Sequence, residues 1–274
     1  MTGGAALTQP AAEGLPGRVA LVLHIRRVGL GVAGMLLGFA VWWVLTTVLL
    51  AGSPMAAAFA PGPALRALGE LLLGSDLPVH VAVSLRRVLV GLACALAIGV
   101  PLGLALGASR LVEAAASPAF QFLRMTSPLS WMPIAVMLFG VGDAPIYFLL
   151  TFAAVWPIML NTAAGVRQLD RAWLQLGRSL AATRWETLRH IIIPGVLRHV
   201  LTGVRLSIGI LWIVLVPCEM LGVSAGLGYF ILDTRDRLAY SELMAMVLLV
   251  GFLGFLLDSL AQGAFWLQTR EKRN

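Results

Sequence analysis

Long apolar stretches alternate with short polar segments along the chain. Six stretches are apolar enough to cross a membrane, at about 28–51, 88–108, 115–140, 146–164, 198–221 and 243–264. Each approaches the roughly 20 residues that a helix needs to span the hydrocarbon core. The third contains Pro118, Pro128 and Pro133, so we expect it to be kinked or broken. The pattern predicts an all-α polytopic membrane protein with about six transmembrane helices and a transmembrane domain over 28–266.

A polar segment over 166–194 separates the fourth and fifth stretches and carries its own helix signals. Thr183 is followed three residues later by Glu186, which is a capping-box pattern, so a helix should begin near Arg184. Pro194 should interrupt that helix, because a proline ring clashes with the preceding turn. The first half of the segment predicts an earlier amphipathic helix, from apolar residues at helical spacing: Leu169, Trp173, Leu176 and Leu180. The segment is predicted to fold as helix, tight turn, helix.

The second apolar stretch carries small residues at every fourth position. A stripe of this kind lets the backbone of another helix approach closely. We therefore expect the second span to pack centrally through its stripe: Gly91, Ala95, Gly99, Gly103 and Gly107.

Composition places the chain in a lipid bilayer. Of its 274 residues, 59% are hydrophobic and 12% are charged, and the mean hydropathy is +0.89, which is too apolar for an ordinary soluble globule. The net charge of +7 comes almost entirely from arginines scattered around apolar spans, which indicates membrane topology rather than nucleic-acid binding. Cys94 and Cys218 lie inside apolar stretches and should behave as small buried hydrophobes.

The arginines also predict an orientation. A cytoplasmic N-terminus puts most of the 20 basic residues on the cytoplasmic side, as the positive-inside bias requires. The N-terminal segment 1–27, the polar segment 166–194 and the tail 267–274 would then face the cytoplasm. Loops over 52–87 and 222–242 would face outside, the first with a short amphipathic helix around 65–73.

The chain lacks the residue patterns of an enzyme or an autonomous pump. Its one lysine, Lys272, lies in the C-terminal tail, so no Gly-rich phosphate loop ending in Gly-Lys-Ser/Thr can exist in it. The four histidines are dispersed without metal-ligand spacing. No nucleophile elbow or paired-carboxylate constellation is present. We expect no metal and no cofactor to be bound by this chain.

Four charged residues lie within or at the margins of the apolar stretches, where charge is costly. Arg205 and Asp258 lie toward predicted cytoplasmic ends and could snorkel. Glu219 is more often a structural hydrogen-bonding group than the carboxylate of a proton-coupled carrier. Arg124 could either attract an anion near a translocation path through the membrane or form an ion pair with Glu219.

Four segments of the chain carry a family resemblance over about residues 59–258. They read VAVSLRRVLVG at Val81–Gly91, SPLSWMPIAVMLFGVGDA at Ser127–Ala144, WPIMLNTAAGVRQLD at Trp156–Asp170 and CEMLGVSAGLGYFILDTRD at Cys218–Asp236. Together they resemble the transmembrane permease subunits of bacterial ATP-binding cassette importers, in the nitrate, sulfonate, taurine and bicarbonate group.

This resemblance implies a type I, MetI-like importer permease fold with a cytoplasmic coupling helix in the inner membrane. The polar segment corresponds to the family's coupling loop. The family's Glu-Ala-Ala falls here on Gln175-Leu176-Gly177, its glycine falls on Ala181, and Ile193-Pro194 supplies its end. The implied partners are cassette ATPase subunits that use ATP and Mg, a second permease copy or a related chain, a periplasmic or lipid-anchored substrate-binding protein, and membrane lipid. No nucleic acid is implied.

The resemblance also implies two sets of functional residues. The ATPase should dock on the coupling loop, through Leu176, Arg178, Leu180, Ala181, Ala182, Thr183, Arg184, Trp185, Glu186 and Arg189. The alternative is that the loop is a solvated surface near anionic lipid headgroups. That would explain its arginines but not the capping box between two amphipathic helices. The translocation path should be lined by the irregular third span and the end of the fifth, through Arg124, Met125, Thr126, Ser127, Ser130, Trp131, Glu219, Met220 and Ser224.

The implied function is a conduit for a small anion that alternates between outward-open and inward-open states. Trp156-Pro157-Ile158 and Asn161-Thr162 look somewhat more nitrate-like than sulfonate-like. A self-contained secondary transporter is the alternative, and it should show internal repeats with matching interrupted helices, of which we find no convincing case. A membrane-embedded enzyme is the third reading and has no catalytic constellation.

Overall fold

The computed structural model describes residues 17–49, 52, 54–74 and 77–271, and every element in that part of the chain is a helix. The chain divides into two compact units, 1–65 and 66–274. The predicted N-terminal segment 1–27 lies largely outside the described residues, as do residues 272–274 of the predicted tail. Five helices are long and apolar enough to cross a membrane, or six if one bent pair counts as a span. The prediction of an all-α protein with about six spans is confirmed.

The first unit contains α1 (Gly17–Val44), a π-helical turn η1 (Leu45–Leu49) and α2 (Pro54–Ala58). The predicted first span corresponds to α1 and η1. Within this unit the indole Nε1 of Trp42 donates to the backbone oxygen of Phe59 at 3.1 Å. The amphipathic helix expected around 65–73 is α3 (Pro61–Gly74).

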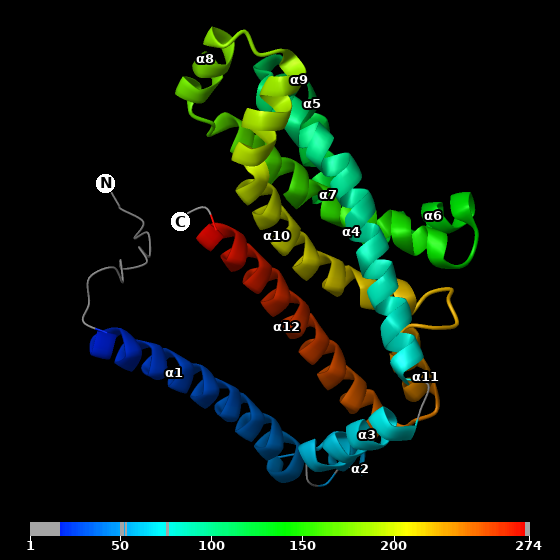
Figure 1. The fold of residues 1–274 in the computed structure, drawn as a ribbon. Coiled ribbons are helices and arrows are strands. Elements are labelled where there is room, and N and C mark those ends of the chain that lie inside the picture. Colours follow the sequence, from blue (N-terminus) through cyan, green and yellow to red (C-terminus); the bar gives the residue numbers. More distant parts are fainter. Residues whose placement is uncertain (1–16, 50–51, 53, 75–76, 272–274) are drawn as a thin grey trace, which may run out of the picture. The chain divides into compact units, whose positions relative to one another are not determined.

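The second unit is built on three long helices that pack side by side: α4 (Leu77–Ala108), α7 (Asp143–Arg167) and α10 (Ile193–Glu219) (Figure 1). The small-residue stripe of α4 faces α7, as predicted. A Cβ added at Gly103 would lie 2.5 Å from the backbone oxygen of Met159, so only glycine permits this approach. The last long helix, α12 (Tyr240–Glu271), is tied to α10 by Trp212, whose Nε1 donates to the oxygen of Val250 at 2.8 Å.

The third predicted span is broken, as its prolines predict. Helix α5 (Arg110–Met125) is followed by a 3₁₀ turn η2 (Pro128–Trp131) and a short helix α6 (Met132–Phe139). The two halves are bent by 88°. Pro118 lies inside α5 and does not end it, whereas Pro128 begins η2 at the bend.

The polar segment folds as predicted into α8 (Arg171–Ser179), a tight turn and α9 (Arg184–Thr187). The expected interruption at Pro194 is wrong. A π-helical turn η3 (Leu188–Ile192) leads from α9 directly into α10, so that residues Arg184–Glu219 form one 36-residue stretch of helix. Pro194 sits in the first turn of α10, where the changed register after a π turn accommodates a missing backbone N–H.

Three further expectations differ from the structure. The second span begins at Leu77 instead of near 88, so most of the expected loop over 52–87 is helix. Helix α11 (Leu227–Asp236) occupies about half of the expected loop over 222–242. Cys218 is buried as expected, but Cys94 is exposed, because it lies off the stripe through which α4 packs on α7.

Candidate functional site: a buried polar network and an exposed hairpin

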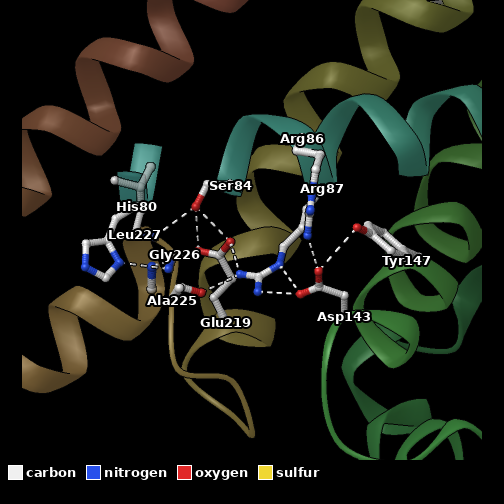
Figure 2. A network of polar contacts seen from close by, with 11 residues as sticks. His80, Ser84, Arg86, Arg87, Asp143, Tyr147, Glu219, Ala225, Gly226 and Leu227 are labelled. Carbon is white, nitrogen blue, oxygen red and sulfur yellow. Dashed lines mark hydrogen bonds and ion pairs between the residues drawn. The ribbon is translucent and has the colours of Figure 1, made fainter. Parts of the chain in front are cut away.

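Three of the four segments that carry the resemblance meet in one polar network at the end of the second unit near α11 (Figure 2). The start of α4 contributes His80, Ser84, Arg86 and Arg87, the start of α7 contributes Asp143, and the end of α10 contributes Glu219. The backbone between α10 and α11 closes the network at Ala225–Leu227. The network thus pairs charged side chains from three helices that are distant in the sequence.

Arg87 is the centre of this network. Its side chain is only 3% exposed, and its Nη1 donates to Glu219 Oε1 and to the Ala225 carbonyl oxygen, each at 2.7 Å. Its Nε and Nη2 donate to Asp143 Oδ1 at 2.9 and 2.6 Å. Arg86 also pairs with Asp143. One guanidinium therefore ties three helices and a loop together.

Glu219 is fully buried, with 0% exposure, and its side-chain oxygens accept hydrogen bonds from Arg87, Ser84 and the backbone. The Ser84 hydroxyl donates to it, lying 2.8 Å from each carboxylate oxygen, and the backbone N–H of Gly228 donates to Oε2 at 2.9 Å. Ser84 Oγ in turn accepts the N–H of Leu227 at 2.9 Å. The positive charges of Arg86 and Arg87 balance the negative charges of Asp143 and Glu219, which lowers the cost of burying them.

The loop before α11 reaches the network because Gly226 has φ +127°, a left-handed conformation that favours glycine. A Cβ there would also lie 2.5 Å from Glu219 Cδ. The N–H of Gly226 donates to His80 Nδ1 at 3.0 Å. Because Nδ1 accepts, the imidazole carries its proton on Nε2. The arrangement clamps this loop onto α4.

The partner of Glu219 is Arg87, so the pairing with Arg124 that we considered is wrong. The structural role favoured for Glu219 is consistent with its burial. Arg205 and Asp258 pair with each other at 3.2 Å, with side chains 46% and 42% exposed. Sequence reasoning missed Arg87, because Arg86-Arg87 was assigned to an external loop, although both arginines lie in a segment that carries the resemblance.

The residues expected to line a path fall in different surroundings. Met125, Thr126, Ser127 and Ser130 lie at the bend between α5 and α6, and Trp131 packs its ring on Phe152 there. Met220 caps the C-terminus of α10, and Ser224 is exposed in the following loop, whereas Glu219 is inside the network. Arg124 lines a cavity between α5 and α7. The structure therefore gathers the residues of the bend and separates Glu219 from them.

The hairpin of α8 and α9 lies at the opposite end of the second unit from α11 (Figure 1). Asp170 caps α8 by accepting the N–H of Ala172 at 2.9 Å. At the C-terminus the N–H of Ala182 donates to the Gly177 oxygen at 2.9 Å and that of Ala181 to the Arg178 oxygen at 3.0 Å, a Schellman motif. Ala181 has φ 54°, the conformation for which the family's glycine at this position is suited.

The capping box between the two helices is present as predicted. The N–H of Thr183 donates to Glu186 Oε2 at 2.7 Å, and the N–H of Glu186 donates to Thr183 Oγ1 at 3.3 Å. The backbone N–H of Thr183, and then its hydroxyl, lower the pKa of the Glu186 carboxyl. Ile191 packs over Gly177, where a Cβ would lie 2.8 Å from Ile191 Cδ1, so the first helix and the π turn are in close contact.

The surface of the hairpin is apolar and basic. Leu180 is 73% exposed, Trp185 is 65% exposed and Trp173 is 59% exposed. Leu176, Arg178, Arg184 and Arg189 are also exposed, and Ala182 is half-buried at the turn. Large exposed apolar side chains outside the spans of a membrane protein favour contact with another protein.

No group of three or more His, Cys, Asp or Glu side chains that could hold a metal ion occurs in the described part of the chain. The described part of the chain is thus a set of membrane-spanning helices with a buried polar network at one end of the second unit and an exposed hairpin at the other. Residues 99–270, more than half of the chain, match the family of binding-protein-dependent transport system inner membrane components. The chain belongs to this family and is a permease subunit of an ATP-binding cassette importer.

The chain is also similar to permease proteins of bicarbonate, nitrate and taurine transport systems. The chain is 36% identical over 193 residues to the bicarbonate transport system permease protein CmpB of Synechococcus elongatus, covering 70% of this chain and 68% of that one. It is 34% identical over 187 residues to the nitrate import permease protein NrtB of a Synechocystis species, covering 68% of each chain. It is 30% identical over 241 residues to the taurine transport system permease protein TauC of Escherichia coli, covering 85% and 86%.

Proposed function

We propose that two copies of this permease, or one copy and a related chain, form the path of a small oxyanion across the inner membrane, with both chain termini in the cytoplasm. Hydrolysis of ATP with Mg takes place in separate cassette ATPase subunits that dock on the α8–α9 hairpin. A binding protein in the periplasm, or anchored to lipid, delivers the anion from outside. This chain itself forms the translocation path and transmits the movement of the ATPase through its hairpin.

The observation that carries this proposal is the build of the hairpin. Its turn is defined by a Schellman motif and a capping box, yet Leu180 and Trp185 beside the turn are 73% and 65% exposed. Exposed tryptophan and arginine side chains are the residue types enriched at binding hot spots. Because η3 joins the hairpin to α10 without a break, a push on the turn is transmitted directly to a helix of the core.

The substrate class is supported by the names of the relatives. Permeases for bicarbonate, nitrate and taurine have in common a substrate that presents a negatively charged group of oxygens. Arg124 is an exposed basic group at the end of α5, beside the bend. Irregular backbone at membrane depth is tolerated where it is buried in protein or lines a cavity. We therefore place the path at the α5–α6 bend, through Arg124, Met125, Thr126, Ser127, Ser130 and Trp131, with Met220 and Ser224 toward the outside.

Co-expression with a cassette ATPase and the binding protein tests the proposal. The purified complex should contain the ATPase and take up anion into proteoliposomes only with ATP. The double variant Arg184→Ala/Trp185→Ala should insert normally but lose ATP-driven uptake. The control Arg235→Ala, an exposed arginine on α11 at the other end of the unit, should transport normally. Normal coupled uptake by the double variant refutes the docking site, and uptake driven by an ion gradient without ATP favours a secondary transporter.

Ligand binding by the cognate external binding protein identifies the substrate. Titration with nitrate, bicarbonate, taurine and alkanesulfonates should give one preferred oxyanion. Preference for a compound that carries no oxyanion group would overturn the substrate class while leaving the permease role intact.

A further inference from the structure

A cavity between α5 and α7 is used by neither the polar network nor the hairpin. Its volume is about 120 Å³, and it is walled by one face of α5 and by Trp156, Met159 and Leu160 of α7. A single water molecule needs at least about 10–15 Å³ of such space. The cavity therefore has room for about ten waters, or for a small ion with part of its hydration.

The α5 wall of the cavity carries four polar side chains beside the ring of Phe120. Glu113, Ser117, Gln121 and Arg124 follow one another at steps of four, four and three, so they share a face of the helix, and all four line the cavity. At about 1.5 Å per residue this polar face is roughly 16 Å long. Polar side chains at membrane depth normally face a cavity or a partner instead of lipid.

The α7 wall holds a hydrogen-bond donor without an acceptor. Trp156 is 9% exposed, and its indole Nε1 is buried with no partner among the described residues. Its ring is held between Phe120 at 5.9 Å and Phe152 at 5.5 Å between centroids. Buried donors are nearly always satisfied in folded proteins. This N–H is closed off from the cavity in the structure, so an acceptor in the cavity would reach it only after the ring turns toward that space.

The charges around the cavity favour an anion. Arg167 pairs with Glu113 at 2.7 Å at one end of the polar face, which cancels those two charges. Arg124, at the other end, forms no ion pair with any described residue. One net positive charge and a free guanidinium therefore lie around a space of small-ion size, and the unsatisfied indole N–H lies behind its wall.

We propose that the α5–α7 cavity binds a small oxyanion, of the size of nitrate or bicarbonate, through Arg124, Gln121 and, once its ring turns toward the cavity, the indole N–H of Trp156. This site deepens the proposed function and rests on it: the ion would occupy the site during passage beside the bend. A flat, singly charged oxyanion accepts two hydrogen bonds from one guanidinium edge and leaves an oxygen for the indole. Taurine also carries an ammonium group, which the net positive charge around the cavity repels.

The test measures ion binding directly, on the full-length chain in lipid nanodiscs without ATPase or binding protein. The probes are ¹⁵N-labelled nitrate, ¹³C-labelled bicarbonate and ¹³C-labelled taurine, whose NMR line widths report weak exchange. Arg124→Gln and Trp156→Phe should each weaken binding of nitrate or bicarbonate roughly tenfold or more, since each removes a hydrogen bond to a charged ligand. The controls are Arg110→Gln, which is exposed on the same helix, and Trp43→Phe, which lies in the other unit.

Broadening of nitrate or bicarbonate that both site variants abolish and both controls retain supports the site. Equal binding by wild type and both site variants, absence of broadening with both small ions, or stronger binding of taurine than of either overturns it. The same variants in the complete importer separate this inference from the proposed function. ATP-driven uptake that is unaffected by Arg124→Gln and Trp156→Phe leaves the importer role standing and removes the site. Ion binding at the site in a chain that associates with no ATPase would support the site and refute the importer role.

Discussion

Replacing Glu219 with glutamine should strongly destabilise the protein although it changes one atom. The carboxylate is 0% exposed and accepts from Ser84, from Arg87 and from the backbone of Gly228. The Glu219→Gln amide keeps one oxygen and turns an N–H₂ group toward a donor, while the cluster gains a net positive charge. Breaking a buried ion pair from one side costs about 3–5 kcal/mol. We expect the lower end, about 3 kcal/mol, since polar groups in the unfolded chain also find partners in a membrane.

Equilibrium unfolding in mixed micelles with increasing sodium dodecyl sulfate measures this cost. The matched control is Asp258→Asn, which makes the same chemical change in the exposed pair with Arg205 and should leave stability unchanged within error. Wild-type stability for Glu219→Gln would refute the structural role and return Glu219 to the candidates for ion transport. Equal losses of unfolding free energy in Glu219→Gln and Asp258→Asn would show that burial of the carboxylate does not determine the size of the destabilisation.

Three further predictions concern single positions. Ala181→Gly should slow amide exchange at Ala182 about fivefold, because a left-handed alanine costs about 1 kcal/mol; unchanged exchange by mass spectrometry would contradict the strained turn. A ¹³C titration should place the pKa of Glu186 below that of an ordinary glutamate, and Thr183→Val should raise it. The stabilisation by this carboxylate is thus complete above its ordinary pKa and lost as pH falls through the lowered one. Gly103→Val should abolish the monodisperse peak in size-exclusion chromatography, whereas Gly209→Val, with open space around it, should retain it.

Local signals made the hairpin predictable. The capping box of Thr183 and Glu186 depends on residues three apart, and the apolar face of α8 depends on helical spacing, so both could be read from the sequence. The stripe on α4 was likewise readable, because its period of four alone specifies the face that meets α7. The broken third span followed from its prolines, though which of them begins the bend did not.

The polar network could not be predicted from local patterns. Ser84 and Glu219 are 135 positions apart, and Arg87 and Asp143 are 56 apart, so their pairing depends on how α4, α7 and α10 pack. Without that pairing, Arg86 and Arg87 look too polar for a span, and the start of α4 was placed near 88 instead of at Leu77. Pro194 was misjudged for a similar reason, because a π turn before it leaves no mark in hydrophobic spacing.

Photo-crosslinking at Leu180 tests the docking of the ATPase most directly. Leu180 is 73% exposed beside the Schellman turn, so a photoreactive phenylalanine analogue introduced there should keep the hairpin folded. In the assembled importer, illumination should link this chain to the cassette ATPase, and the same analogue in place of the exposed Leu238, just after α11, should not. An importer that transports normally while position 180 links only to lipid would contradict the account.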